Sequence, residues 1–327
     1  MEKYLEIVKR VRRYFKSRKT NSKIKSFVKN KDPKVEYTKN FWSRNNSWDY
    51  YYQRHQENEK SAHYVPYDYY VFNIQPKLNN VKHFLYVEDK QMYDRLYGNS
   101  NVLMPKTLFR CNEGIFMDEE YNHIDDIQYF LKQLNQDLYL KKTKRSHGGQ
   151  GIEKYISKNG WFYNATDNEK LDIQKLYRRY NGNFIVQGCH EQHEALKKLH
   201  PSSLNSLRVN SYRSIKTNEV HILMASVRMG RSGSFVDNVS LGGMAIGLKI
   251  DENNEAALRE FSFKPFSNDR ITSHPDSNIT FKNYKIPGFP SVVEAVKKLS
   301  NVVPSYRVIS WDFSIDKNGK AVMIELN

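Results

Sequence analysis

Apolar residues recur along this chain in two spacings, which together predict a mixed α+β fold. Alternation of apolar and polar residues over 204–215 and 220–229 is typical of long strands in an antiparallel sheet. Apolar residues three or four apart over 123–134 and 290–303 predict amphipathic helices. A shorter helix is predicted to end at Gly98. Further strands are predicted at 102–109, 137–142, 183–188, 308–315 and 321–326.

Residues 1–31 differ from the rest of the chain in charge. They hold twelve lysines and arginines and two acids, whereas the whole chain carries a formal net charge of +16. Apolar residues from Tyr4 to Phe15 recur at helical spacing, so this segment is predicted to be a basic amphipathic helix. Such a helix either docks on its own domain or lies on an anionic membrane surface. No nucleic-acid partner is expected, because the remaining chain offers no second basic face and no nucleic-acid-binding motif.

Composition excludes several classes of protein. The chain has 327 residues, of which 39% are apolar, so it can bury a large core in one or two domains. No apolar run approaches the length of a transmembrane helix, and the charged N-terminus is unlike a secretory signal. Cys111 and Cys189 are too few for a disulfide scaffold. We therefore expect a cytoplasmic protein, or one that is peripheral at the inner membrane surface.

A strand lysine followed by a glycine-rich loop is the first feature that indicates chemistry. Lys141 lies in the strand predicted at 137–142. The loop after it contains Ser146, His147, Gly148, Gly149 and Gly151. Glycines let backbone N–H groups approach phosphate oxygens, and a lysine supplies charge. The loop matches neither a Walker A loop nor a dinucleotide-binding fingerprint, so by itself it is better explained as an ordinary turn.

The last two predicted strands carry three oxygen donors. Asp312 lies on the first of them, and Glu325 and Asn327 lie two residues apart at the end of the second. Residues two apart on a strand face the same side. Hard cations such as Mg²⁺ prefer oxygen ligands, so this hairpin predicts a magnesium site. The alternative is a polar strand that faces solvent.

Two arginines on the intervening strands form the third feature. Arg208 and Arg228 lie on the strands predicted at 204–215 and 220–229. Planar guanidinium groups suit the recognition of phosphate and carboxylate, although a single arginine is more often a surface or sheet residue. A polar, glycine-rich loop follows, which contains Arg231, Ser232, Asp237, Asn238, Gly242 and Gly243.

In this order the three features resemble the ATP-grasp fold, in which two α+β lobes with antiparallel sheets hold ATP between them. The segments LNSLRV, SVRMGRSGSFVDN, LGG and SWDFSI resemble motifs of the sugar-transfer-associated ATP-grasp family. The resemblance covers about residues 85–327. It departs from the usual pattern at Lys142, where a proline often stands. The sequence also ends at Asn327, where such proteins usually continue, so either the chain is truncated or the fold closes without a tail.

The resemblance implies roles for these residues, with ATP and Mg²⁺ as cofactors. Lys106 and Lys141 would neutralise phosphate charge, under the glycine-rich loop. Arg208 and Arg228 would be catalytic, and the loop after Arg228 would contact the acceptor. Magnesium would be held by Asp312, Glu325 and Asn327. The adenine hinge would lie at 184–193, with contacts from Gln187, Gly188, Cys189 and His193. A zinc cluster at Cys189, His190 and His193 is the alternative there, but the histidine spacing does not fit the zincin motif.

The resemblance also implies an organisation and an activity. Charge and composition set apart a basic helical segment (1–31) and an aromatic-rich region of unassigned role (32–84), and the resemblance implies two lobes (85–187 and 188–327). The activity would be an ADP-forming ligase that joins a small-molecule or glycan carboxylate to an amine, in polysaccharide or capsule biosynthesis. One alternative is a phosphotransferase that acts on a hydroxyl. The other is a non-catalytic module that binds membrane or an anionic polymer through residues 1–31.

Overall fold

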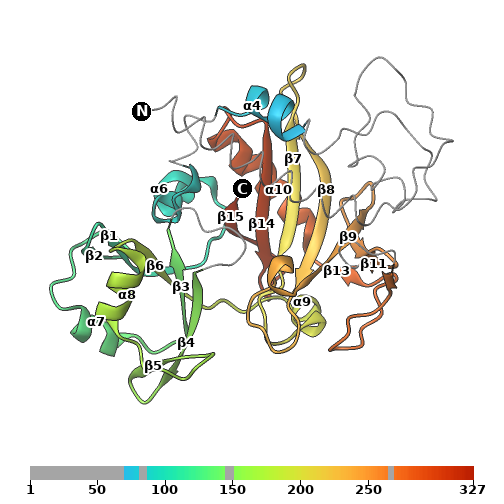
Figure 1. Ribbon diagram of the computed structural model, residues 1–327. Coiled ribbons are helices and arrows are strands. Elements are labelled where there is room, and N and C mark those ends of the chain that lie inside the picture. The colour runs from blue at the N-terminus through green and yellow to red at the C-terminus, as the bar shows by residue number, and fades with distance from the viewer. Residues whose placement is uncertain (1–69, 81–86, 144–150, 264–268) are drawn as a thin grey trace. The chain divides into compact units, whose positions relative to one another are not determined.

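Figure 1 shows the computed structural model. Contacts within the chain divide it into two units. The described residues are 70–80, 87–143, 151–263 and 269–327. One unit comprises 1–80 and 263–271, and its described part contains the π-helix η1 (Tyr70–Ile74), helix α4 (Gln75–Leu78) and strand β12 (Arg270–Ile271). The helix predicted within residues 1–31 lies outside the described residues. The two large sheets and the candidate site described below belong to the other unit, 81–262 and 272–327.

The first of two large sheets is six-stranded and follows the order β2-β1-β6-β3-β4-β5. Every neighbouring pair in it is antiparallel. The strands are β1 (Thr107–Asn112), β2 (Ile115–Asp118), β3 (Leu138–Lys142), β4 (Ile152–Lys158), β5 (Trp161–Asn164) and β6 (Phe184–Gly188).

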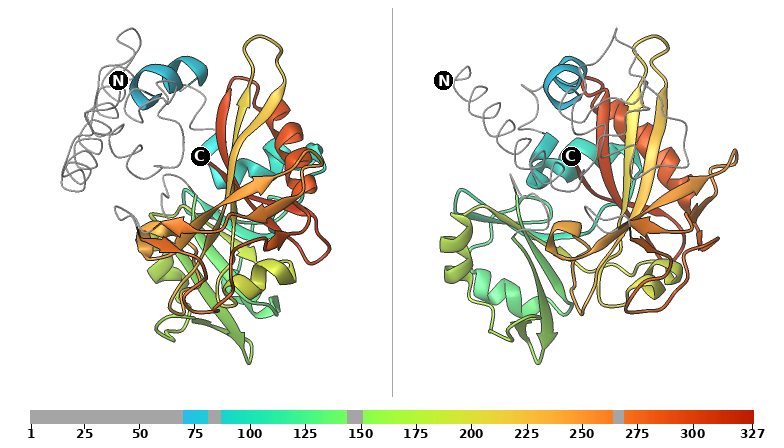
Figure 2. Two further views of the ribbon diagram at one scale, coloured as in Figure 1. Left: turned by 90° about the vertical axis from the view of Figure 1, so that its right-hand side faces the viewer. Right: turned by 45° about the vertical axis from the view of Figure 1, so that its right-hand side comes forward.

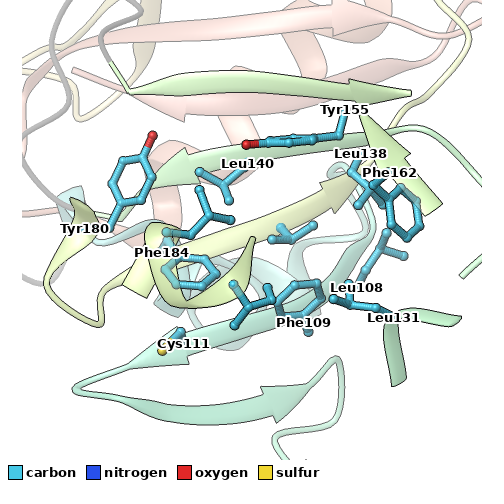
Figure 3. Close-up of a cluster of buried hydrophobic side chains, with 13 residues drawn as sticks. Leu108, Phe109, Cys111, Leu131, Leu138, Leu140, Tyr155, Phe162, Tyr180 and Phe184 are labelled. Atoms are coloured by element: carbon cyan, nitrogen blue, oxygen red, sulfur yellow. The ribbon is translucent and has the colours of Figure 1, made fainter. Parts of the chain in front are cut away.

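One face of this sheet is covered by two helices, α7 (Ile127–Gln133) and α8 (Ile173–Tyr180). Each helix begins after an aspartate, Asp126 or Asp172, whose side chain accepts from two backbone N–H groups of the first turn. Figure 3 shows the core between the sheet and these helices. It contains Phe109, Cys111, Leu131, Leu138, Leu140, Leu176 and Phe184. The apolar surface buried on this face holds the two helices against the sheet.

The opposite face of the same sheet carries polar groups. Arg110, Ile185 and Lys141 are cross-strand neighbours in β1, β6 and β3. Cross-strand neighbours point to the same side, and residues adjacent in sequence point to opposite sides. Because Phe109 and Leu140 belong to the core, Arg110 and Lys141 must lie on the other face.

The second large sheet has seven antiparallel strands in the order β13-β10-β9-β8-β7-β14-β15. Figure 2 shows its long central strands from two further sides. Strand β11 (Ser262–Phe263) lies outside it. The strands are β7 (Leu207–Arg213), β8 (Val220–Met229), β9 (Met244–Ile250), β10 (Ala256–Leu258), β13 (Lys285–Ile286), β14 (Val308–Ile315) and β15 (Ala321–Leu326).

Helix α10 (Phe289–Val302) packs on one face of the seven-stranded sheet, against β8, β14 and β15. The helix begins after Gly288, whose φ is 81°. A Cβ there would lie 2.4 Å from the carbonyl oxygen of Gly319, so only glycine fits this approach. In β7, Leu207 and Val209 are fully buried, whereas Arg208 is only half-buried. The alternation thus places Arg208 on the face that α10 does not cover.

Short helices complete this unit. A one-turn segment, η3 (Lys90–Met92), runs directly into α6 (Tyr93–Tyr97), which is followed by η4 (Gly98–Ser100). The Asp89 side chain caps the start by accepting from the Gln91 N–H at 3.2 Å. Helix α9 (Glu194–Leu199) follows β6, and η5 (Val239–Leu241) precedes β9. No helix in the described ranges is long and apolar enough to span a bilayer.

The α+β prediction is confirmed, and its errors are local. The strand expected at 102–109 begins only at Thr107, because Pro105 has no N–H for a ladder. Leu103 instead accepts from the N–H of Met323 at 2.8 Å. The helix expected at 123–134 begins only at Ile127, after its Asp126 cap. Helix α6 ends before Gly98, as predicted.

Candidate functional site

The centre of the candidate site is the carboxylate of Asp312 on β14. Its Oδ1 accepts from Nε of Arg208 at 2.8 Å, and its Oδ2 accepts from Nη2 of the same group at 2.6 Å. Asp312 lies opposite Arg208 in the register of β14 and β7, so pairing of the strands alone brings the two together. The Asp312 side chain is 3% exposed. A carboxylate this deeply buried depends on such donors for its charge.

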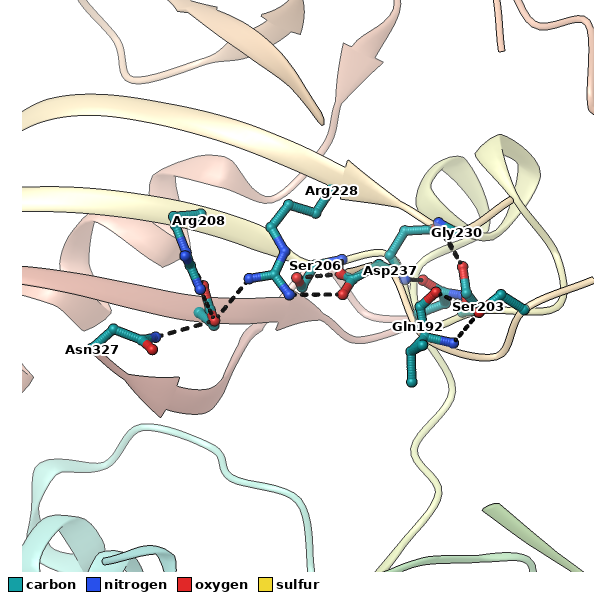
Figure 4. A network of polar contacts seen from close by, with 12 residues as sticks. Gln192, Ser203, Ser206, Arg208, Arg228, Gly230, Asp237 and Asn327 are labelled. Atoms are coloured by element: carbon teal, nitrogen blue, oxygen red, sulfur yellow. Dashed lines mark hydrogen bonds and ion pairs between the residues drawn. The ribbon is translucent and has the colours of Figure 1, made fainter. Parts of the chain in front are cut away.

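Arg228 on β8 joins Asp312 to a second buried aspartate. Its Nη1 donates to Oδ2 of Asp312 at 3.1 Å and its Nη2 to Oδ1 of Asp237 at 2.8 Å. Asp237 also accepts from the N–H of Ser206 at 2.8 Å and from its hydroxyl. Figure 4 shows Arg208, Arg228 and Asn327 converging on one carboxylate, with Ser206 and Asp237 beyond Arg228. Arg228 is thus held by a carboxylate on each side, whereas Arg208 is held by Asp312.

Glu325 on β15 lies opposite Asp312 in the strand register. Its Oε2 is 2.8 Å from Nζ of Lys90, which belongs to η3. Burial raises the pKa of Glu325, but Lys90 and Lys141 lower it by more, so the net shift is downward. Burial lowers the pKa of Lys141 to about 8, with a further contribution from Lys90, while Glu325 opposes the shift. Two lysines from different elements therefore share the surroundings of one glutamate.

The pKa shifts in the arginine cluster have the same physical causes. Burial raises the pKa of Asp312 above the ordinary value, although Arg208 and Arg228 oppose this shift. Burial alone would lower the pKa of Arg228, but Asp312 and Asp237 raise it by more. The cluster thus combines two guanidinium groups with the carboxylates of Asp312 and Asp237. This is an arrangement suited to anions such as phosphate.

The comparison with known families gives a single match over most of the chain. Residues 72–327 match the family described as sugar-transfer associated ATP-grasp. The chain belongs to this ATP-grasp family. The resemblance carried by the sequence motifs is thereby confirmed, and the two antiparallel sheets are those of an α+β ATP-grasp protein. No curated protein matches the chain.

Solved structures resemble this ATP-grasp chain only distantly. An ADP complex of N5-carboxyaminoimidazole ribonucleotide synthetase has a TM-score of 0.42 and 9% identity, over 74% of this chain and 45% of the other. An L-amino acid ligase from Bacillus licheniformis has a TM-score of 0.40 and 10% identity, over 75% of this chain and 41% of the other. The VanG D-Ala:D-Ser ligase from Enterococcus faecalis has a TM-score of 0.40 and 13% identity, over 74% of this chain and 52% of the other. The chain spans about half the length of these proteins.

The three predicted metal ligands lie together. Asp312 and Glu325 face each other across the hairpin, and Nδ2 of Asn327 lies 3.3 Å from Oδ2 of Asp312. The backbone of Asn327 is fixed by two hydrogen bonds with Ser310, at 2.7 and 3.0 Å. Two carboxylates and an amide oxygen are hard donors of the kind Mg²⁺ takes. Within the described ranges no group of three His, Cys, Asp or Glu residues is gathered for a metal, so Asn327 is needed to complete three protein donors.

Of the two predicted phosphate-side lysines, Lys141 contributes positive charge around Glu325, and Lys106 pairs with a glutamate outside the predicted site residues. Nζ of Lys106 pairs with Oε2 of Glu119 at 3.0 Å, and its side chain is 63% exposed. Lys90, whose side chain is 8% exposed, contacts Glu325 instead. The sequence interpretation did not name Lys90, and the role it assigned to Lys106 stays a prediction. The one available signal for Lys90 was its place directly after the helix-capping Asp89, and this says nothing about the distant Glu325.

The predicted hinge residues serve partly as structural links. Gln187 is buried and donates from Nε2 to the carbonyl of Pro105 at 3.4 Å. The N–H of Gly188 donates to the carbonyl of Lys106 at 2.9 Å. Nδ1 of His193 accepts from the Ala195 N–H at 3.1 Å and so caps α9.

The end of the hinge is more open. Cys189 is an exposed free cysteine. Nε2 of the neighbouring His190 is buried and has no hydrogen-bond partner among the described residues. Burial lowers the pKa of His190 to about 4, with a contribution from Lys141, so its ring is neutral near pH 7. The sequence interpretation placed His190 within the hinge at 184–193 and in the alternative zinc cluster, but did not name it among the nucleotide contacts.

Four residues of the glycine-rich loop lie outside the described residues: Ser146, His147, Gly148 and Gly149. Gly151, the last residue of that loop, is described and has a φ of 76°. Its carbonyl accepts from the N–H of Lys142 at 3.2 Å, so it lies beside the end of β3. The placement of the loop relative to Lys141 therefore stays a prediction.

The first residues of the polar loop after Arg228 are tightly packed. A Cβ on Gly230 would lie 2.6 Å from Oγ of Ser203, whose hydroxyl accepts from the Gly230 N–H. Further on, the N–H of Ser232 donates to Asp276 at 2.8 Å, and Arg231 is half-buried. A Cβ on Gly243 would lie within 2.9 Å of three backbone carbonyls, including those of Asp237 and Asn238. Gly242, beside it, has a φ of 99° and open space around it.

Proposed function

We propose that this chain is an ATP-dependent ligase that activates a carboxylate as an acylphosphate and joins it to an amine. The observation that carries this proposal is the charged cluster on β7, β8, β14 and β15. The buried carboxylate of Asp312 and the partly buried carboxylate of Glu325 stand opposite each other there, with two arginines on the first and two lysines around the second. Membership in the sugar-transfer-associated ATP-grasp family supports the same reading.

The first step would transfer the γ-phosphoryl group of ATP. A substrate carboxylate oxygen attacks the γ-phosphorus, the bond to the β-phosphate oxygen breaks, and ADP leaves. Phosphoryl transfer is catalysed mainly by positioning and by charge stabilisation. Lys90 and Lys141 supply positive charge to the phosphates, and Arg228, with Arg208, binds the transferring group. This assignment gives Lys90 the role that the sequence interpretation gave to Lys106.

Mg²⁺ fits the oxygen donors of Asp312, Glu325 and Asn327, and when bound it would neutralise phosphate charge. In the structure the Asp312 carboxylate is engaged by Arg208 and Arg228. Binding of ATP with Mg²⁺ would therefore exchange these contacts, which would release both guanidinium groups toward the phosphate or the carboxylate substrate. Arg208 and Arg228 are thus bound, before ATP arrives, to the same carboxylate that would bind Mg²⁺.

The second step would consume the acylphosphate. The amine nitrogen attacks the carbonyl carbon, the bond from carbon to the phosphate oxygen breaks, and the amine loses a proton. Water must be excluded meanwhile, because it competes with the amine. The loop that contains Arg231, Ser232, Asp237, Asn238, Gly242 and Gly243 is our candidate for contacts to the acceptor. Ser146, His147, Gly148, Gly149 and Gly151 are our candidates for the cover over the phosphates.

We further propose that the carboxylate belongs to a small molecule or glycan, and that the reaction serves surface polysaccharide or capsule biosynthesis in the cytoplasm. Residues 1–31 would supply the contact with an anionic membrane surface, because their charge and apolar spacing favour it. Removal of residues 1–31 should abolish binding to anionic vesicles and leave turnover in solution intact. Loss of both would favour a binding module instead.

The decisive experiment measures ADP and free phosphate in the presence of ATP, Mg²⁺ and panels of carboxylates and amines. We expect both products to appear only when a carboxylate and an amine are present together. The Glu325→Gln variant should lose this turnover while keeping the far-ultraviolet circular dichroism of the wild type. ADP formation with the phosphate retained on a hydroxyl substrate would identify a phosphotransferase. Full turnover in Glu325→Gln would contradict the assignment of the site.

A further inference from the structure

The short segment Lys90–Tyr97 makes contacts with both large sheets. Toward the six-stranded sheet, the N–H of Lys90 donates to the carbonyl of Thr143 at 3.1 Å. Nε2 of Gln91 donates to the carbonyl of Cys111 at 2.9 Å. Toward the seven-stranded sheet, Lys90 pairs with Glu325, and Tyr97 meets Trp311 edge-on with ring centroids 6.5 Å apart. The segment thus connects the two sheets and carries Lys90 into the site.

One side of this segment is fastened by a buried arginine that the proposed reaction does not use. Nη2 of Arg110 on β1 lies 2.5 Å from Oδ2 of Asp94, on α6. Its guanidinium carbon lies 3.8 Å from the ring centroid of Tyr121. The Tyr121 hydroxyl lies 2.6 Å from Oδ1 of Asp94 and 3.0 Å from the carbonyl oxygen of Gln91. Arg110 and Tyr121 together therefore hold both carboxylate oxygens of Asp94.

The burial of Arg110 costs folding free energy. Its side chain is fully buried, and neither Nε nor Nη1 finds a hydrogen-bond partner among the described residues. A buried donor without an acceptor costs stability. A well-packed apolar side chain of similar volume is often as stabilising as a buried ion pair, or more so. Packing energy alone therefore does not account for an arginine here, whereas orientation of Asp94 does.

We propose that Arg110 is a positioning residue, which acts through Asp94 and α6 to hold the ammonium group of Lys90 in the nucleotide site. Asp94 follows Lys90 by four residues, within one continuous stretch of η3 and α6. Contacts that hold the Asp94 side chain in one position therefore also hold the helical turn that contains Lys90. The inference rests on the proposed function, because it takes Lys90 to contact the phosphates of ATP.

The test is a double-mutant cycle on the Kd for ATP with Mg²⁺, measured by calorimetry on the full chain. Lys90→Met and Arg110→Met should each weaken binding by about tenfold or more, the effect expected for loss of a charge-assisted contact. The double variant should bind no more weakly than Lys90→Met alone, because Arg110 has nothing left to position. This non-additivity would not arise if Arg110 acted only on overall stability.

Two further variants keep the test decisive if Arg110→Met does not fold. Tyr121→Phe removes only the hydroxyl that holds Asp94, and it should weaken ATP binding in the wild type but not in the Lys90→Met background. Arg179→Met is the matched control, since Arg179 pairs with Glu153 in the same lobe, 2.5 Å away. It should lower the Tm without changing the Kd.

Two results would overturn the inference: independent, multiplied effects of Arg110→Met and Lys90→Met, or an unchanged Kd in Tyr121→Phe. A wild-type chain that binds no ATP would be a different failure, because it would remove the proposed function itself. A Kd that changes in Lys90→Met but in neither Arg110→Met nor Tyr121→Phe would leave the function standing and reject the positioning role.

Discussion

The two halves of the charged cluster are built in different ways. On the arginine side, Arg208 and Arg228 meet Asp312 within one sheet, and strand register alone brings Arg208 and Asp312 together. On the lysine side, Glu325 forms an ion pair with Lys90 of η3, and Lys141 on β3 of the other sheet adds a second positive charge nearby. The arrangement of the arginine side is thus set within one sheet, whereas the lysine side depends on the relative positions of separate elements.

This difference teaches where the site can be disturbed. Cross-strand partners a few ångströms apart stay together as long as the sheet stays folded. Lys90 does not lie on a strand of either sheet. Its segment is held by a backbone hydrogen bond to Thr143 and by side chains such as Asp94 and Gln91. We therefore expect changes on the arginine side to affect folding and activity together. Changes on the lysine side should affect nucleotide binding more than stability.

The largest effect should come from removing the carboxylate that holds the arginine side. Asp312→Ala leaves Arg208 and Arg228 without their shared partner, in a site where the Asp312 side chain is 3% exposed. Breaking a buried pair in this way costs about 3–5 kcal/mol. Urea unfolding should show a loss of this size, and ADP release should be abolished.

The matched control for Asp312 is an exposed carboxylate. Glu260 pairs with Lys282 at 3.0 Å, and both side chains are more than 60% exposed. Glu260→Ala should change the free energy of unfolding by about 0.5 kcal/mol or less. If Asp312→Ala were no more destabilising than this control, the arginine side would not be the rigid half of the site.

An intermediate effect should distinguish the two candidate lysines. Lys90→Met removes a buried cation beside Glu325, so the Kd for ATP should rise by about tenfold or more. Lys106→Met removes an exposed cation paired with Glu119, and exposed pairs contribute little. Isothermal titration with ATP and Mg²⁺ measures both. The reverse order of effects would restore the role that the sequence interpretation gave to Lys106.

The smallest effect is a pH dependence on the lysine side. Lys141 has a pKa of about 8 in the folded chain, lowered by burial and by Lys90. As pH rises through about 8, the folded protein loses this positive charge, so the Kd for ATP should increase. Over the same window the unfolded chain still binds the proton, so this group makes the folded state more stable as pH rises toward the ordinary lysine value of 10.5.

The control for this pH effect is Lys141→Arg, since a guanidinium stays charged across the range. The rise in Kd above about pH 8 should disappear in that variant. An identical pH profile in the wild type and in Lys141→Arg would assign the dependence to another group.

Much of the fold could be predicted because the local pattern is strong. Alternating residues over 204–215 and 220–229 fold as β7 and β8, and the helix expected over 290–303 is α10. Errors occurred at element ends, where capping by Asp126 and the missing N–H of Pro105 outweighed periodicity. The family, too, was identified from motifs on β7, β8 and β14 and in the loop between β8 and β9.

Parts of the candidate site were predictable for the same reason. Asp312 and Glu325 share one hairpin, and their opposition follows from two strands and a short turn. Arg208 lies on the strand next to them. That both arginines would be bound to Asp312 was not predictable, because side-chain partners depend on sheet order, which the local pattern does not contain.

The sequence by itself determined the class of fold, the family and the hairpin that carries the carboxylates, because periodicity and turn residues act over a few positions. Only the tertiary structure decided which lysine stands beside Glu325, since Lys90 and Glu325 are 235 residues apart in the sequence. It also decided that Arg110 is buried beneath α6, where nothing in its own strand calls for a charge. Contacts between remote elements are fixed by packing and by the pairing of buried charges, and neither can be read from the spacing of residues within one element.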